Sequence, residues 1–145
     1  MRLSTCLSCL SCLGAGLLAG AAHADPKPTR AAYCVAALKA RAEPVAERVR
    51  RGEAGAEAQL MPIVTASFAF VGSAYKQGLR SPQADELMRA AEKSQSQLPP
   101  AELGKVQDAC QSEAKQLLSS VSSIERRLVN HAARSRIAKL RKPSS

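Results

Sequence analysis

The sequence predicts an all-α fold, an antiparallel bundle of about four helices with a long basic C-terminal helix. Three observations lead to this prediction. Apolar residues recur at spacings of three and four along residues 25–145, and no segment shows the period-two alternation of a half-buried strand. Alanine, the strongest helix former, is the most frequent residue of this region. Gly52, Gly78 and Pro99 separate the periodic segments, as expected at helix ends.

The first 24 residues are typical of a cleaved export signal. Arg2 gives a positively charged start, residues 13–22 (LGAGLLAGAA) form an uncharged apolar run, and residues 22–24 (AHA) match the small-x-small pattern before a cleavage site. The run is shorter than the roughly 20 apolar residues that cross a bilayer. We therefore expect a signal peptide at 1–24, a single helical domain at 25–145, and a periplasmic or secreted protein.

The five cysteines fall into two groups. Cys6, Cys9 and Cys12 form a CxxCxxC array that would suggest an iron–sulfur or zinc site in an intact chain, but they lie in the expected leader, so no metal site is predicted. Cys34 and Cys110 remain, and such a pair in an oxidising compartment most simply forms one disulfide. The bond would close a loop of about 77 residues and stabilise the fold by about 4–5 kcal/mol. Two buried free thiols are the alternative.

The first predicted helix begins with Thr29 as its N-cap and runs to Arg51, with Gly52 as its stop. Pro44 falls inside this helix and is expected to kink or divide it, because proline lacks the backbone donor and clashes with the preceding turn. The second helix covers about residues 54–77, with Gly78 after its C-terminal end.

Residues 58–75 contain no charged residue, and this run has two interpretations. It is either a membrane span or a central helix that is buried on most of its sides. Eighteen residues rise about 27 Å, slightly short of a bilayer core, and Pro62 and several polar residues dilute the run. We favour the buried helix and predict no transmembrane span after the leader, while contact of residues 58–75 with a membrane stays open.

The third predicted helix has Ser81 as its N-cap, Pro82 at its first position, and Asp85 and Glu86 near its positive dipole end. Residues 93–97 are polar and are expected to fray.

The fourth predicted helix starts after Pro100 and runs about forty residues to Leu140. Cys34 and Cys110 lie on the apolar stripes of the first and fourth helices, so the disulfide is expected to join these two helices. The stripe of the fourth helix steps by three and four, as in a helix packed along its whole length, and consists of Leu103, Val106, Cys110, Ala114, Leu117, Val121, Ile124 and Leu128.

Catalytic and cofactor chemistry find little support in the sequence. His131 is the one histidine after the leader, and no paired acid motif, glycine-rich phosphate loop or HExxH zinc motif is present. Met61, Met88 and His131 could in principle ligate haem, but no CxxCH motif is present and methionine on an apolar stripe is typical of core packing, which we therefore favour. We therefore predict no enzyme, no catalytic residues, no metal and no cofactor.

The charge pattern is the most distinctive surface feature. The whole chain carries 21 basic and 12 acidic residues, a net charge of +9. Removal of the leader takes away one arginine and no acid, so residues 25–145 carry 20 basic and 12 acidic residues, or +8. A small basic cluster lies at Arg48, Arg50 and Arg51. The predicted basic surface lies in a C-terminal extension at about 126–145 and consists of Arg126, Arg127, Arg134, Arg136, Lys139, Arg141 and Lys142.

This basic surface has two interpretations. Arg127, Arg134 and Arg141 recur at intervals of seven and therefore share one helix face, which suits an acidic partner such as anionic lipid, lipopolysaccharide, an acidic protein or nucleic acid. Nucleic acid ranks last, because the chain is predicted to be exported and has few aromatic side chains for base stacking. Alternatively, the cations are solvated and complement the negative end of the helix dipole.

The sequence thus predicts an exported, non-enzymatic helical protein that acts through protein–protein or envelope contacts with an unknown partner. The alternative is a peripheral envelope-surface protein that docks its basic C-terminal helix on anionic lipid or lipopolysaccharide.

Overall fold

A computed structural model describes residues 27–141 of the chain. The predicted signal peptide with its three cysteines, and Lys142 of the basic surface, lie outside the described residues. The all-α class is confirmed, with five helices packed together: α1 (Pro28–Arg50), α2 (Ala56–Lys76), α3 (Gln83–Gln95), α4 (Pro100–Ser120) and α5 (Ser123–Leu140).

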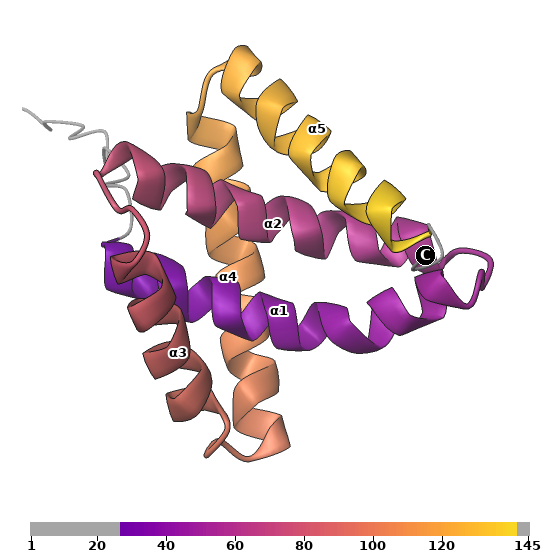
Figure 1. Cartoon of the computed structure of the whole chain (residues 1–145), viewed down its shortest axis with the longest axis horizontal. Helices are drawn as coiled ribbons and strands as arrows, with labels where there is room; N and C mark the ends of the chain where they lie inside the picture. Colours follow the sequence, from indigo (N-terminus) through magenta and orange to yellow (C-terminus); the bar gives the residue numbers. More distant parts are fainter. Residues whose placement is uncertain (1–26, 142–145) are drawn as a thin grey trace, which may run out of the picture.

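The α1–α2 hairpin is the centre of the molecule (Figure 1). Its two helices run antiparallel and make the most extensive contact of any helix pair. In Figure 1, α4 crosses the far side of both helices at a steep angle, and α3 and α5 pack near opposite ends of the hairpin. α3 contacts α1, whereas α5 returns over α2. The hairpin therefore supplies a packing surface for every other helix.

The ends of α1 and α2 follow the predicted turn chemistry closely. α1 starts at Pro28, whose fixed φ suits the first helical position, so Thr29 lies in the first turn and is not the N-cap. Pro44 does not divide α1, which continues to Arg50. Gly52 and Gly78 follow α1 and α2 with φ of 73° and 87°, a left-handed conformation that glycine adopts without strain. The two predicted glycine stops are thereby confirmed.

α3 begins one residue later than predicted. It starts at Gln83, Ser81 makes no side-chain cap, and Asp85 and Glu86 lie in the first turn, as expected. The predicted fraying is wrong up to Gln95, because this side chain is buried and its amide donates a 2.7 Å hydrogen bond to the Tyr33 carbonyl of α1. A buried polar side chain that finds such a partner holds the last turn in place.

Two apolar clusters form the core. The first joins α1, α2 and α4 around Leu38, Phe70 and Leu117, and it contains the disulfide between Cys34 and Cys110, whose Cα atoms are 5.3 Å apart. The predicted link between α1 and the α4 segment is therefore confirmed. The second cluster joins α1, α2 and α5, and Ile137 is its contribution from α5. More than half of the buried apolar residues are alanine, so the helices pack through small side chains.

The fourth predicted helix is wrong in one respect, because the chain turns within it. α4 ends at Ser120, Val121 is extended with ψ of 157°, and Ser122 is the N-cap of a new helix, α5. The predicted stripe therefore leaves the core at the turn. Ile124 and Leu128, expected to be buried, are 70% and 64% exposed.

α2 is long and apolar enough to cross a membrane by length and composition, a test that core helices of soluble proteins also pass. It packs against α1, α4 and α5. Only 39% of its most apolar 18-residue window is buried, however. Part of the apolar surface of α2 is thus left uncovered by the rest of residues 27–141.

Candidate functional site

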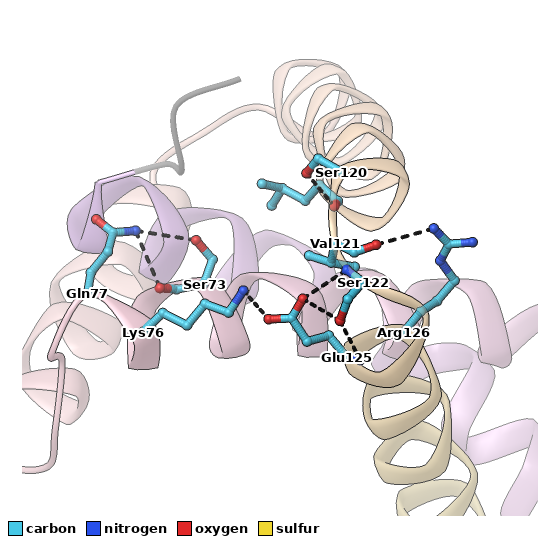
Figure 2. A network of polar contacts seen from close by, with 9 residues as sticks. Ser73, Lys76, Gln77, Ser120, Val121, Ser122, Glu125 and Arg126 are labelled. Carbon is cyan, nitrogen blue, oxygen red and sulfur yellow. Dashed lines mark hydrogen bonds and ion pairs between the residues drawn. The ribbon is translucent and has the colours of Figure 1, made fainter. Parts of the chain in front are cut away.

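A network of polar contacts fixes the start of α5 (Figure 2). The Ser122 backbone N–H donates to Glu125 Oε2 at 2.9 Å, and the Glu125 backbone N–H donates to Ser122 Oγ at 3.2 Å. This reciprocal capping box satisfies two backbone donors that a helix end otherwise leaves free. Lys76, at the C-terminal end of α2, pairs with the Glu125 carboxylate across the helix interface. The network therefore ties the first turn of α5 to α2.

The Glu125 carboxylate is held in its charged form. The hydrogen bond from Lys76, followed by those from the backbone and hydroxyl of Ser122, lowers the pKa of Glu125 from 4.5 to about 2. Donors and a positive charge around a carboxylate favour its ionised state. The one acidic residue of α5 is thus engaged in placing the helix.

Two members of the predicted basic surface also hold α5. Arg126 Nε donates to the Leu118 carbonyl at 3.1 Å, and its Nη2 donates to the Val121 carbonyl at 3.5 Å. These carbonyls lie at the C-terminal end of α4, where backbone acceptors lack helical partners. Arg141 Nη1 pairs with Glu57 Oε1 of α2 at 3.1 Å. Arg126 and Arg141 therefore act between helices.

Three other predicted cations point away from the core. Ala133 and Ile137 are buried and mark the inward side of α5. At 100° of rotation per residue, Arg127 and Arg134 lie about a quarter turn from the buried side on one flank of α5, and Lys139 lies farther round on the other flank. All three side chains are exposed, and none has an ion pair within residues 27–141. Arg136 is turned to a different side, where it lines a cavity between α1, α2 and α5.

Exposed apolar side chains lie between these cations. Ile124 is nine residues from Ala133 and therefore half a rotation away from the buried side, and Leu128 follows it one turn later. Leu128 and Tyr75, which is 61% exposed, line one shallow cavity between α2, α4 and α5. We define the outward face of α5 by five residues: Ile124, Arg127, Leu128, Arg134 and Lys139.

The small basic cluster at the end of α1 is different, because acidic side chains neutralise it. Arg48 and Arg51 both pair with Glu53, at 2.8 Å and 2.6 Å, and these hydrogen bonds lower the pKa of Glu53. Arg50 pairs with Glu47. The outward face of α5 thus differs from this cluster because its cations have no ion pair in the part of the chain that the structure describes.

The residues weighed for cofactor or catalytic chemistry lie apart in the fold. His131 is exposed on α5, Met61 packs against the second apolar cluster, and Met88 lines a cavity between α1, α2 and α3. Within residues 27–141, no group of three or more histidine, cysteine, aspartate or glutamate side chains is placed to hold a metal ion.

No family model matches the chain, and neither a curated protein nor a solved structure shows significant similarity to it.

The turn that creates the outward face was missed in the sequence, although a signal for it is present. Residues 119–123 (SSVSS) contain four serines, and Ser122 and Glu125 form the S-x-x-E pattern of a capping box. The apolar spacing of three and four continues across this pattern, so periodicity predicts one unbroken helix where the capping box indicates a helix start. Without the turn, Ile124 and Leu128 belong to a core stripe and give no indication of a surface.

Proposed function

We propose that the protein is an exported, non-enzymatic binding protein that docks the outward face of α5 on an anionic lipid surface. One observation carries the proposal: two exposed aliphatic side chains, Ile124 and Leu128, lie between three cations without acidic partners in the described chain. Helices that lie in a membrane interface insert such apolar residues at the level of the headgroups and place lysine and arginine among the phosphates. The disulfide supports an oxidising compartment, in agreement with the export signal that the sequence predicts.

A lipid surface fits this face better than an acidic protein does. A stable protein interface buries about 800 Å² on each partner and has an apolar centre. The outward face of α5 has only Ile124 and Leu128 as its apolar centre. It is the convex surface of a single helix, which offers a protein partner little area to contact. Each arginine or lysine near an anionic membrane contributes about 1 kcal/mol. Three cations therefore supply about 3 kcal/mol at low salt, and the binding should weaken as salt increases.

Vesicle co-sedimentation tests the proposal. We expect the purified protein to bind vesicles of phosphatidylglycerol mixed with phosphatidylcholine at low salt, and not vesicles of phosphatidylcholine alone. The double variant Arg127→Gln/Arg134→Gln removes about 2 kcal/mol of electrostatic attraction and should bind roughly 30-fold more weakly. Ile124→Ser/Leu128→Ser should also bind more weakly, with the same dependence on salt.

A matched control separates the face from the net charge. Arg89→Gln/Lys115→Gln removes two exposed cations of α3 and α4 that have no ion pair within the described residues, and should leave vesicle binding close to that of the parent protein. An equal loss in this control would show that only net charge matters and would contradict docking through α5. Binding to the neutral vesicles, or none to the anionic ones at low salt, would also contradict it.

A further inference from the structure

An apolar groove runs along the α1–α2 hairpin and is separate from the outward face of α5. Two adjoining cavities form it, one of about 260 Å³ bounded by α5 and one of about 400 Å³ bounded by the start of α3. Val35 of α1 and Val71 of α2 line both cavities, so the two lie next to each other along the hairpin. The larger volume lies within the range of small-molecule sites, roughly 300–1,000 Å³, and the smaller lies just below it.

The groove is where the apolar surface of α2 lacks a partner. Val35, Val64 and Phe68 are only half-buried in its floor, and Val71 at the junction is 47% exposed. The lining side of α2 extends from Leu60 to Tyr75, a rise of about 22 Å at 1.5 Å per residue. One leaflet of a bilayer core, the span of one lipid chain, is about 15 Å. A single acyl chain therefore fits along the groove with room for a head group.

The charges at the α5 end of the groove favour an anionic head group. Three cations, Lys39, Arg50 and Arg136, line this cavity together with one acid, Glu43. Lys39 already pairs with Glu92 at 2.7 Å, and Arg50 pairs with Glu47. Arg136 has no ion pair within residues 27–141. Its guanidinium can donate two parallel hydrogen bonds to a carboxylate, a geometry that arginine forms readily.

Other occupants fit the groove less well. A second copy of the chain that used the same face would place a second set of three cations and one acid in the interface, an excess of like charge that disfavours association. A partner helix is about 10–12 Å wide and needs more room than two cavities of this size provide. We propose that the groove binds one long-chain fatty acid, with its carboxylate on Arg136 and its chain along Val64, Phe68 and Val71. The proposal is independent of membrane docking, because the outward face of α5 does not line the groove.

Binding of dansylaminoundecanoic acid, a fluorescent fatty acid, tests this site. We expect its emission to rise and shift to the blue on addition of the purified protein, and oleate to displace it. Val71→Glu places a carboxylate at the junction of the two cavities. A bound acyl chain would bury this charge, which is unfavourable, so the variant should bind the probe at least about tenfold more weakly. Circular dichroism verifies that the variant is folded. We expect it to fold, because Val71 is partly exposed and a charged side chain there can reach solvent.

The carboxylate contact has its own variant. Arg136→Gln should weaken displacement by oleate about fivefold, as expected for loss of a partly exposed ion pair, and leave displacement by uncharged oleyl alcohol unchanged. Arg134→Gln removes the same charge from the outward face of the same helix and should change neither ligand. An equal effect of Arg136→Gln on both ligands would overturn the assignment of the head group.

Two further outcomes would overturn the proposal as a whole. One is a lack of any change in probe emission in the presence of the parent protein. The other is displacement by lysophosphatidylglycerol but not by oleate, which would show that the groove selects a phospholipid. Vesicle binding by α5 is measured separately and can fail or succeed without affecting either result.

Discussion

At the scale of single residues, Glu125 makes the stability of the protein depend on pH. Its pKa is about 2 in the folded chain, against an ordinary value of 4.5, because Lys76 and Ser122 stabilise the carboxylate. A carboxyl whose pKa is lowered by folding contributes stability that is complete above the unfolded value and is lost as the pH falls toward the folded value. The contribution of Glu125 is therefore present above pH 4.5 and disappears between pH 4.5 and about 2.

Glu125→Gln tests this dependence without removing the capping box, because glutamine also occurs at this position of the motif. We expect urea unfolding of the parent protein to lose more stability over the pH range 4.5 to 2 than that of the variant. Glu125→Ala removes both the charge and the hydrogen bonds that this carboxylate accepts from Ser122, and should lower the stability at neutral pH below that of Glu125→Gln. The same pH dependence in parent and Glu125→Gln would show that ionisation of Glu125 contributes nothing to the stability.

The residue scale also shows how far sequence analysis reaches. Cys34 and Cys110 could be paired from the sequence, because they are the two cysteines that follow the expected leader, and their places on apolar stripes predicted which helices the bond joins. The roles of Arg126 and Arg141 could not be predicted in this way. Their partners, the Leu118 carbonyl and Glu57, come within reach only after α5 has turned back over α2. The number of cations could be read from the sequence, whereas their ion pairs depend on the fold.

At the scale of elements, Ser122 determines where α5 begins. Loss of an N-cap side chain costs about 1 kcal/mol, within a range of 0.5–2 kcal/mol. We expect Ser122→Ala to lower the free energy of unfolding by this amount and to speed hydrogen exchange at the Glu125 amide, which donates to Ser122 Oγ. Ser122→Asn should restore most of the loss, because asparagine caps as well as serine. Unchanged exchange at this amide in Ser122→Ala would contradict the role of the cap.

Periodicity alone could not place this element boundary. The steps from Leu117 through Val121 and Ile124 to Leu128 are four, three and four, as in one continuous helix. The first three helices were predicted to within a few residues, because glycine, proline and first-turn acids mark their ends. The α4–α5 turn depends on a cap and on the contacts of α5 with α2, which a pattern along one chain does not contain. The sequence therefore predicted the basic residues of the candidate surface, but not the turn that exposes Ile124 and Leu128 beside them.

At the scale of the whole molecule, the α1–α2 hairpin divides the packing into two sides. α4 and the disulfide cover one side and form the larger apolar cluster. The groove lies along another, between the start of α3 and the end of α5. α5 contributes to two surfaces at once, because Arg136 lines the groove while Arg127 and Arg134 face away from it. The two proposed lipid sites can thus be tested by substitutions on different sides of one helix.

The disulfide stabilises this arrangement as a whole. The loop it closes, from Cys34 to Cys110, contains all of α2 and α3, so the bond restricts most of the unfolded chain. Because the core is built mainly of alanine, few large side chains compensate for its loss. We expect Cys34→Ala/Cys110→Ala to lower the free energy of urea unfolding by about 2–5 kcal/mol, a range that includes the value expected from the length of the closed loop. Reductant should destabilise the parent protein by a similar amount and leave the variant unchanged; equal stability of the oxidised and reduced parent would refute this role.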